Sequence, residues 1–261
     1  MLRLLTYNVH SFIGTDRRRE PERIASVIRD SGARIVALQE VRWSARSEGA
    51  HALMALARAL GMDWHFQRTA TFAGEQFGLA VLSSLPMRLV KGAPLPRLGP
   101  AMPERRSALW VEVHTSQGPL QVVCTHLAVL SARDRMAQAE ALLGPDWLGG
   151  MPGPAVLMGD LNAGMRAAAY KRLAAVLACA RVEHPSKHPS KHPGKHPGKH
   201  PTFPSWMPLT RIDHIMAANG ARLANAHALR TATSRVASDH LPFVAEAVLD
   251  DAGASEPRLT E

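Results

Sequence analysis

An α/β fold is predicted by two features of the chain. Short apolar runs of strand length alternate with segments whose apolar residues recur at helical spacing. In addition, several of the apolar runs end in acid, amide or imidazole side chains, as strands of packed α/β domains do when they deliver functional groups. The 261 residues, 46% of them hydrophobic, can bury a sizeable core. We therefore expect one domain over residues 1–249 and a disordered polar tail over residues 250–261.

Four segments are predicted to be helical and to pack on a sheet. Residues 21–32 carry Pro21 in the first turn and Gly32 at the end, which are signals of a helix start and a helix stop. Residues 50–60 place leucines at helical spacing and stop at a glycine. The other two predicted helices cover residues 132–143 and 167–178.

Strands are predicted where short runs rich in Val, Ile, Leu and Ala occur. Beyond the start of the chain, they cover residues 108–113, 120–125, 155–158, 212–216 and 243–249. The start of the chain is a short apolar strand without the long apolar segment of a signal peptide. No run reaches the roughly 18 apolar residues of a membrane helix. We expect a soluble, cytoplasmic protein.

Composition narrows the partners without choosing one. The net charge of +9 suits phosphate-bearing partners such as nucleic acid or an anionic lipid surface. No clear nucleic-acid module is present, and 5% aromatic residues are too few for an obvious base-stacking platform. Cys124 and Cys179 are too few for a disulfide framework, so the thiols are expected to stay reduced. We expect a monomer.

Residues 184–201 form a low-complexity insert. The unit His-Pro-Ser-Lys occurs twice, His-Pro-Gly-Lys follows twice, and a last His-Pro closes the repeat. A Pro at every fourth position excludes a helix and favours extended conformations. The insert is either a tolerated expansion in a surface loop or a set of cations beside a phosphate site, and its histidines could capture transition metal. Neither role is needed for catalysis.

Six short motifs carry the polar groups that can do chemistry. Each has a plain structural explanation when taken alone, such as a helix cap for Asp160 and Asn162 or a surface ion pair of Glu40 with Arg42. Their occurrence together at the ends of separate apolar runs predicts one shared site. The motifs are Thr6-Tyr7-Asn8, Leu38-Gln39-Glu40, Thr125-His126-Leu127, Gly159-Asp160-Leu161-Asn162, Arg211-Ile212-Asp213-His214 and Ser238-Asp239-His240.

The donor atoms of these motifs suit a hard divalent cation. Asn8, Glu40, Asp160, Asn162 and Asp239 offer oxygen ligands, which Mg²⁺ or Mn²⁺ prefers, and such an ion can polarise a phosphoryl oxygen. No HExxH motif and no CxxC pair offers a zinc alternative.

Two histidines can supply acid–base chemistry. His240, oriented by a carboxylate such as Asp213, can hold or deprotonate an attacking water. His126 can stabilise or protonate the departing oxygen. Together with the cation, these groups describe hydrolysis of a phosphate ester.

In this order the six motifs resemble those of the endonuclease/exonuclease/phosphatase superfamily, whose members include DNase I-like nucleases, neutral sphingomyelinases and inositol-polyphosphate 5-phosphatases. The resemblance covers residues 1–249 and is to a small bacterial-type member. It implies a four-layer DNase I-like fold, in which a two-sheet β-sandwich is flanked by helices. It also implies a Mg²⁺-dependent hydrolase, with Mn²⁺ as an alternative.

The resemblance implies a role for each motif residue. Asp160 and Asn162 would position water and phosphate, and Asp213 would orient His240, with His126 as the remaining catalytic residue. The implied metal-site residues are Asn8, Glu40 and Asp239.

Two further positions match less firmly. Arg106 resembles the arginine that approaches the phosphate, and Glu75 could support His126, although a purely structural role stays open for both. His214 is a position where the family varies, so no role is assigned to it. His126 itself follows the branch shared by DNase I-like, sphingomyelinase-like and 5-phosphatase-like members, which argues against an abasic-site endonuclease.

Three functions follow in order of preference. The first is a Mg²⁺-dependent phosphodiesterase that acts on nucleic acid. The second is a phospholipid or small-molecule phosphoesterase of the sphingomyelinase or inositol-phosphatase type. The third is an inactive binding protein, which is disfavoured because such members tend to lose metal and histidine positions that this chain retains. The sequence does not distinguish DNA, RNA, lipid and small phosphoesters as substrates.

Overall fold

Two mixed β-sheets form the centre of the molecule. The computed structural model describes residues 1–43, 52–72, 74–99, 104–179 and 200–249. Within these residues, the first sheet has the strand order β11-β12-β1-β2-β4-β3 and the second has the order β5-β6-β7-β8-β10-β9. The strands of the first sheet are β1 (Leu2–Asn8), β2 (Ile35–Trp43), β3 (Asp63–Phe72), β4 (Glu75–Ser83), β11 (Ala221–Ala228) and β12 (Phe243–Leu249). Those of the second sheet are β5 (Met87–Pro94), β6 (Ser107–Thr115), β7 (Gly118–His126), β8 (Ala155–Asp160), β9 (Ala178–Cys179) and β10 (Asp213–Ala218).

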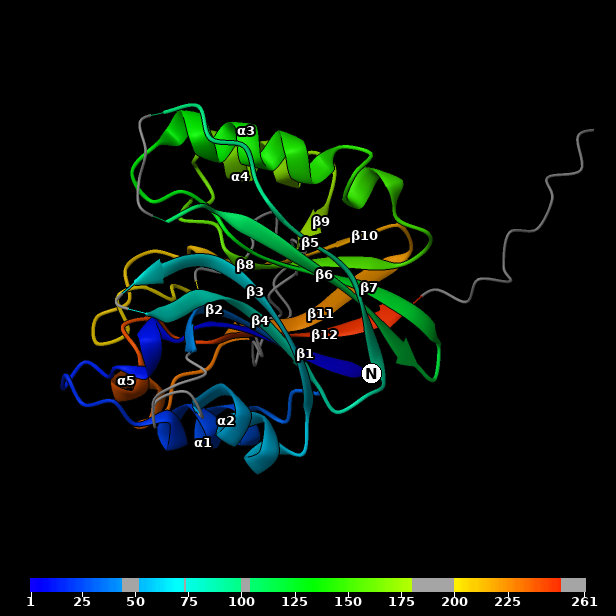
Figure 1. Cartoon of the computed structure of the whole chain (residues 1–261). Helices are drawn as coiled ribbons and strands as arrows, with labels where there is room; N and C mark the ends of the chain where they lie inside the picture. The colour runs from blue at the N-terminus through cyan, green and yellow to red at the C-terminus, as the bar shows by residue number, and fades with distance from the viewer. Residues whose placement is uncertain (44–51, 73, 100–103, 180–199, 250–261) are drawn as a thin grey trace, which may run out of the picture.

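Helices cover the outer faces of both sheets. Figure 1 shows α1 and α2 below the first sheet and α3 and α4 above the second, which gives four layers. Each helical face buries apolar residues against the nearest sheet, so each outer layer has its own hydrophobic cluster. The helices are α1 (Pro21–Ser31), α2 (Ala52–Leu60), α3 (Ala132–Leu143), α4 (Ala168–Ala174) and the short α5 (Ser234–Ala237). Among the described residues, no helix is long and apolar enough to cross a membrane.

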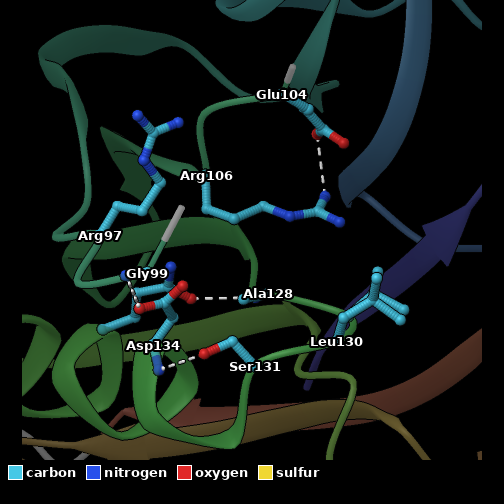
Figure 2. A pocket seen from close by; sticks show the side chains of 10 residues that line it. Arg97, Gly99, Glu104, Arg106, Ala128, Leu130, Ser131 and Asp134 are labelled. Carbon is cyan, nitrogen blue, oxygen red and sulfur yellow. Dashed lines mark hydrogen bonds and ion pairs between the residues drawn. The ribbon is translucent and has the colours of Figure 1, made fainter. Parts of the chain in front are cut away.

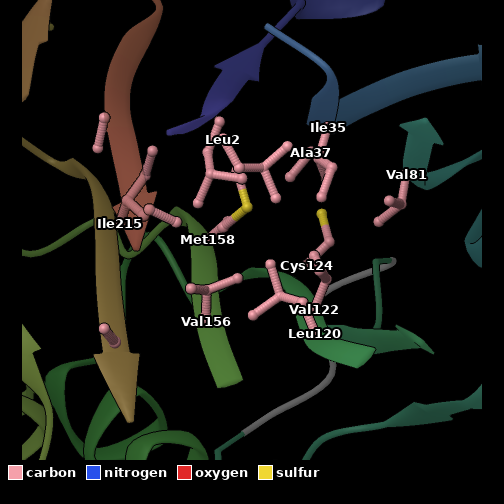
Figure 3. Close-up of a cluster of buried hydrophobic side chains, with 14 of the residues drawn as sticks. Leu2, Ile35, Ala37, Val81, Leu120, Val122, Cys124, Val156, Met158 and Ile215 are labelled. Carbon is pink, nitrogen blue, oxygen red and sulfur yellow. The ribbon is translucent and has the colours of Figure 1, made fainter. Parts of the chain in front are cut away.

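The inner faces of the sheets pack against each other through an apolar core. Ile35 and Ala37 of the first sheet face Val122, Cys124 and Met158 of the second in one buried cluster (Figure 3). Polar contacts of Cys124 also cross this core: the buried Gln39 donates to its Sγ atom at 3.4 Å, and the thiol donates to the carbonyl oxygen of Leu38 at 3.5 Å. Burial raises the pKa of the Cys124 thiol to about 12, so it stays protonated. The fold is the predicted two-sheet sandwich.

The strand directions bring six polar chain segments to one end of the sandwich. β1 runs parallel to β2, and β7 runs parallel to β8, so their carboxyl ends share an edge. β10 and β12 run antiparallel to these strands, with Asp213 opposite Asp160 and Phe243 opposite Thr6. The prediction that every motif follows a strand is therefore wrong for two of them. The Asp213 and Asp239-His240 motifs lie at the start of a strand or just before it, and antiparallel pairing returns them to the same edge.

Glycine permits a close approach of β7 and β8 beside the site. A Cβ atom on Gly159 would collide with the backbone carbonyl of Thr125. Thr125 precedes His126 and Gly159 precedes Asp160, and these two functional residues are paired in the parallel register. The glycine thus sets the spacing of the strands at the point where their side chains meet.

Most predicted elements occur where they were expected. The helix over 132–143 and the strand over 243–249 have the predicted bounds, and Gly32 ends α1 in the left-handed conformation with φ 65°. Both cysteines are free.

One predicted helix is too long. The helix expected over residues 167–178 stops at Ala174, because Leu177 is buried and Ala178 and Cys179 pair with β10 as the edge strand β9. The predicted tail at 250–261 and the repeat as far as residue 199 lie outside the described residues.

Candidate active site

A β-bulge directs Glu40 toward the end of β1. The pairing of β2 with β4 shifts register between Leu38 and Val41, and Glu40 adopts a left-handed backbone with φ 57°. Non-glycine residues are seldom held in this region unless the surrounding structure fixes them, and such positions cluster at functional sites. The Nδ2 atom of Asn8 donates to Oε1 of Glu40 at 3.1 Å, so the bulge brings two predicted metal-site residues into contact.

Asp160 lies where the two sheets meet. Nδ2 of Asn8, from the first sheet, also donates to Oδ2 of Asp160 at 3.1 Å. The other carboxylate oxygen, Oδ1, accepts the backbone N–H of Asn162 at 2.8 Å, and Asn162 has a left-handed φ of 46°. Burial raises the pKa of Asp160 to about 7, and the nearby charge of Asp213 adds to the effect. A carboxyl with a pKa near neutrality suits proton exchange with a water molecule.

His126 and Asn162 form a second contact pair. The amide nitrogen of Asn162 lies 3.0 Å from Nε2 of His126 and also donates to the carbonyl oxygen of Leu127 at 3.0 Å. Burial and the positive charge of Arg106 hold the pKa of His126 well below its ordinary value, so the ring is neutral. With the amide nitrogen donating, Nε2 accepts and the ring proton lies on Nδ1, for which no described residue provides a hydrogen bond.

Asp213 and His240 form a buried ion pair. Nδ1 of His240 lies 2.9 Å from Oδ2 of Asp213, and its Nε2 atom is 3.8 Å from Oδ2 of Asp160. Burial alone would lower the pKa of His240, but Asp213, assisted by Asp160 and Asp239, raises it to about 10. His240 is therefore a cation at neutral pH, fixed by Asp213 and facing Asp160.

Asp239 lies at the more open side of the site. Its side chain is 37% exposed, and its Oδ1 atom is 3.8 Å from Nδ1 of His10. Ser238 links this segment to β1, because its hydroxyl donates to the carbonyl oxygen of Asn8 at 2.7 Å. The structure thus holds Asp239 next to the chain segment that carries Asn8 and His10.

The donor set fits a divalent cation. Asp160, Asp213 and Asp239 act on the protonated His240, and Asn8 links the carboxylate of Glu40 to that of Asp160, so carboxylates outnumber the protonated imidazole in this group. The buried Oδ1 atom of Asp213 has no hydrogen-bond partner among the described residues. Buried carboxylates that outnumber their cations are costly unless a positive ion joins them, and oxygen ligands are those that Mg²⁺ prefers.

Asp160, Asp213 and His240 are a second possible metal set, since their ligand atoms lie within 4.8 Å of one another. This interpretation conflicts with the state of His240. Its Nδ1 atom is engaged by Asp213, and its raised pKa keeps a proton on the other nitrogen. Imidazole binds a metal through a deprotonated nitrogen, so the more open carboxylates of Glu40 and Asp239 are the better candidates for holding a metal.

The predictions for Arg106 and Glu75 have different outcomes. Arg106 lies beside His126, as its influence on the pKa of that ring requires, and its guanidinium pairs with Glu104 at 2.8 Å. Glu75 is instead paired with Arg42 at 2.9 Å and with Arg19 at 3.8 Å. These two arginines engage both of its carboxylate oxygens, so the expected support of His126 by Glu75 is not found in the structure.

Several residues that organise the site were not singled out from the sequence. Thr202 accepts the backbone N–H groups of Ile212 and Asp213 at 3.3 Å each, and the ring of Phe203 packs on His240 at 4.9 Å between centroids. Ser238 stands inside the Ser-Asp-His motif and could have been noticed as an orienting hydroxyl. His214, which was assigned no role, is buried and bonded to the carbonyl oxygen of Ala163 at 3.0 Å.

A comparison of the sequence with known protein families shows the family of this chain. The sequence profile of the Endonuclease/Exonuclease/phosphatase family matches residues 5–240, which is most of the chain. The chain belongs to this family. Members of the endonuclease/exonuclease/phosphatase family are hydrolases of phosphate esters, and they generally use a divalent metal. Among curated proteins, no significant sequence match is found.

Solved structures of the endonuclease/exonuclease/phosphatase family share the fold. A family member from Beutenbergia cavernae is 26% identical, with a TM-score of 0.75 over 95% of this chain and 71% of that one. The human Nocturnin catalytic domain with bound sulfate is 22% identical, with a TM-score of 0.71 over 95% and 94% of the two chains. Sphingomyelinase C from Streptomyces griseocarneus is 19% identical, with a TM-score of 0.63 over 94% and 98%. These similarities extend over nearly all of the chain.

The ion pair of Asp213 with His240 can be tested by NMR of the histidine side chains. We expect His240 to titrate at about 10 in the wild type. In Asp213→Asn the pKa should fall by several units, because the effect of burial is then opposed mainly by Asp160. Asp146→Asn, a matched change at an exposed position, should leave the titration of His240 unaltered. A wild-type His240 that titrates near 6.5, or an Asp213→Asn protein with an unchanged His240, would contradict the assigned pair.

Proposed function

We propose that the chain is a Mg²⁺-dependent phosphodiesterase that acts on nucleic acid, with Mn²⁺ as a possible substitute. The observation that carries this proposal is the group of carboxylates at the junction of the two sheets, where Asp160 and Asp213 face the protonated His240 and Asn8 joins Glu40 to Asp160. Such a set can hold a hard cation and handle the proton of an attacking water in one place. The neutral His126, whose Nε2 atom lies 3.4 Å from Oδ2 of Asp160, completes a site for in-line displacement at phosphorus.

Glu40 and Asp239 would hold the metal ion. Asn8 contributes by fixing Glu40, since its amide nitrogen donates to that carboxylate and its Oδ1 atom accepts the backbone N–H of His10 at 3.1 Å. When bound, the ion polarises a phosphoryl oxygen and neutralises charge that develops in the transition state.

Asp160 and His240 would act on the attacking water. The carboxylate of Asp160 accepts the water proton, for which a raised pKa is favourable. His240, held protonated by Asp213, donates from Nε2 to the water or to a phosphoryl oxygen next to Asp160. Because Asp213 engages Nδ1, the ring cannot rotate away from this orientation.

His126 and Asn162 would meet the departing oxygen. Since His126 is neutral, we infer that it stabilises the departing oxygen by a hydrogen bond from Nδ1–H and does not act as a strong acid, so the departing alkoxide takes its proton from solvent. The amide of Asn162 fixes the ring from one side. Arg106, which is close enough to lower the pKa of His126, would contribute positive charge to the phosphate.

Charge favours nucleic acid as the substrate. A net charge of +9 and the arginines near the site favour a polyanion, and nucleic acid is the first candidate. A phospholipid is the second candidate, because the loop after Phe203 exposes Trp206, Met207 and Leu209, and Phe203 itself contacts His240. Exposed apolar side chains beside a site can contact a lipid surface.

Activity should require a divalent metal and Glu40. We expect purified protein with Mg²⁺ to hydrolyse bis(p-nitrophenyl) phosphate and single- or double-stranded nucleic acid, and excess EDTA to abolish this turnover. Phospholipid vesicles in the same panel test the second candidate. Glu40→Gln should remove most activity and weaken the binding of Mn²⁺, measured by calorimetry, because one charged ligand is lost.

Glu22→Gln is the matched control, since Glu22 is exposed on α1. It should retain activity and metal affinity. Full turnover in excess EDTA, or a Glu40→Gln protein with wild-type turnover and Mn²⁺ affinity, would rule out the metal assignment.

The two histidines should differ in their dependence on the leaving group. Either alanine variant is expected to lose roughly 10²- to 10⁴-fold in kcat on an alkyl diester, with little change in KM. On a p-nitrophenyl diester, His126→Ala should lose far less, because p-nitrophenolate departs without help. His240→Ala should lose similarly on both substrates. Equal losses for His126→Ala on the two diesters would leave it a phosphate-binding residue without a role at the leaving oxygen.

A further inference from the structure

A hollow lies directly beside the candidate active site, on the side of His126. It has a volume of about 260 Å³, and we name it the Arg97 pocket. Figure 2 shows Arg106 running along its upper side toward Glu104, with Ala128, Ser131 and Asp134 below and Arg97 standing on the opposite flank from Leu130. Its lining includes Arg97, Glu104, Arg106, Ala128, Leu130 and Asp134.

The pocket is continuous with the site through two elements. Ala128 and Leu130 follow His126 in the chain, and Asn162 donates to the carbonyl oxygen of the intervening Leu127 at 3.0 Å. Arg106 lines the pocket and also lowers the pKa of His126 by its charge. A substrate whose phosphate is held at Asp160 and His126 therefore has this pocket as a neighbour.

The segment from Ala128 to Leu130 forms a wall of the pocket below Arg106, and hydrogen bonds within the protein hold this wall in place. Gln138 accepts the backbone N–H of Ala128 at 2.9 Å, and Arg135 donates to the carbonyl oxygens of Ala128 and Val129 at 2.8 and 2.6 Å. Leu130, at the end of this wall, is 78% exposed. Such a wall costs little to order on binding and offers an apolar surface to part of a ligand.

The acids of the pocket are already engaged. Asp134 accepts the backbone N–H groups of Leu98 and Gly99 at 2.8 and 3.2 Å, which ties the loop before β6 to the start of α3. Glu104 accepts from Arg106 at 2.8 Å and from Thr69 at 3.3 Å, and burial raises its pKa. These carboxylates hold protein groups in place, so they are poorly available to a ligand cation.

Arginines supply the positive charge around the pocket. A second hollow, also of about 260 Å³, is lined by Arg97, Arg105 and Arg106, so two of its arginines are shared with the Arg97 pocket. Arginine presents a planar set of donors that matches phosphate oxygens, and it repels quaternary ammonium groups. The lining therefore favours an anion over a cationic group such as choline.

We propose that the Arg97 pocket binds a second phosphate of the substrate, carried by the organic group that is esterified to the scissile phosphate. This inference rests on the proposed function and adds a substrate requirement to it. Arg97 is the residue that reads the second phosphate, while the wall from Ala128 to Leu130 contacts the apolar part of the group between the two phosphates. In nucleic acid the second phosphate would be that of the neighbouring nucleotide.

The test compares substrates that differ only in a second phosphate. The dinucleoside phosphate TpT is compared with pTpT and TpTp, and the ratio of kcat/KM values gives the preference. We expect the wild type to prefer at least one of the phosphorylated forms by roughly tenfold, as for a hydrogen bond to a charged group. A second pair, glycerophosphoglycerol with and without a terminal phosphate, distinguishes a nucleotide source of the phosphate from a small-molecule source.

Four variants make the test specific. Arg97 is exposed, so its substitution should not disturb folding. In Arg97→Gln the preference ratio should fall toward one, and Arg97→Lys should keep part of it because the charge remains without the planar donor set. Arg97→Glu should instead raise turnover of p-nitrophenyl phosphorylcholine relative to bis(p-nitrophenyl) phosphate. Arg29→Gln, which removes the same charge from α1, should keep the wild-type ratio.

The outcomes separate this inference from the proposed function. A wild type that cleaves TpT without preferring any phosphorylated form, or an Arg97→Gln protein with an unchanged ratio, overturns the pocket assignment and leaves the phosphodiesterase in place. If none of the diesters is cleaved, the proposed function fails. In that case calorimetry of thymidine 3′,5′-bisphosphate against thymidine 5′-monophosphate still tests the pocket, and equal affinities in the wild type would overturn it.

Discussion

The position of Asp160 constrains the rest of the site. Its carboxylate is buried at the junction of the two sheets, where it receives a hydrogen bond from Asn8 of the opposite sheet and lies between His126 and His240. A charge in such a place is unfavourable unless partners or an ion compensate it. The surrounding groups are arranged to do so, and the same arrangement makes Asp160 able to exchange a proton near neutral pH.

Strand direction explains how distant parts of the chain reach this carboxylate. The parallel pairs β1–β2 and β7–β8 end at one edge, and the antiparallel strands β10 and β12 begin there. The Asp213 and Asp239-His240 segments can therefore enter the site from the opposite direction along the chain. Because the elements that deliver these groups belong to packed sheets, the site is held by the core of the sandwich and not by loops alone.

Much of this could be predicted from the sequence, since strand-length apolar runs and ordered motifs are local signals. The strand over 243–249, the helix over 132–143 and the contacts among Asn8, Glu40, Asp160 and His126 follow from them. β3 was not predicted, because nearly all of its residues are half-buried or exposed and give no clear alternation. The two arginine partners of Glu75 come from other parts of the chain, so the sequence could not distinguish them from His126.

The bulge at Glu40 and the Arg97 pocket could also not be predicted from the sequence. A bulge depends on the register between two strands, and α2 and β3 separate β2 from β4 in the chain. The pocket is formed by the segment before β6 together with the segment after β7, which tertiary structure alone brings together. Neither feature has a motif of its own.

Because Asn8 donates to Asp160 across the two sheets, we expect these residues to act as one unit in catalysis. A double-mutant cycle with Asn8→Ala and Asp160→Asn, read as kcat/KM on bis(p-nitrophenyl) phosphate with Mg²⁺, tests this expectation most directly. If the contact at 3.1 Å positions Asp160 for the reaction, the double variant should lose about as much as the worse single variant. Losses that multiply in the double variant, with both single variants folded, would show that the two residues act independently and would contradict this account.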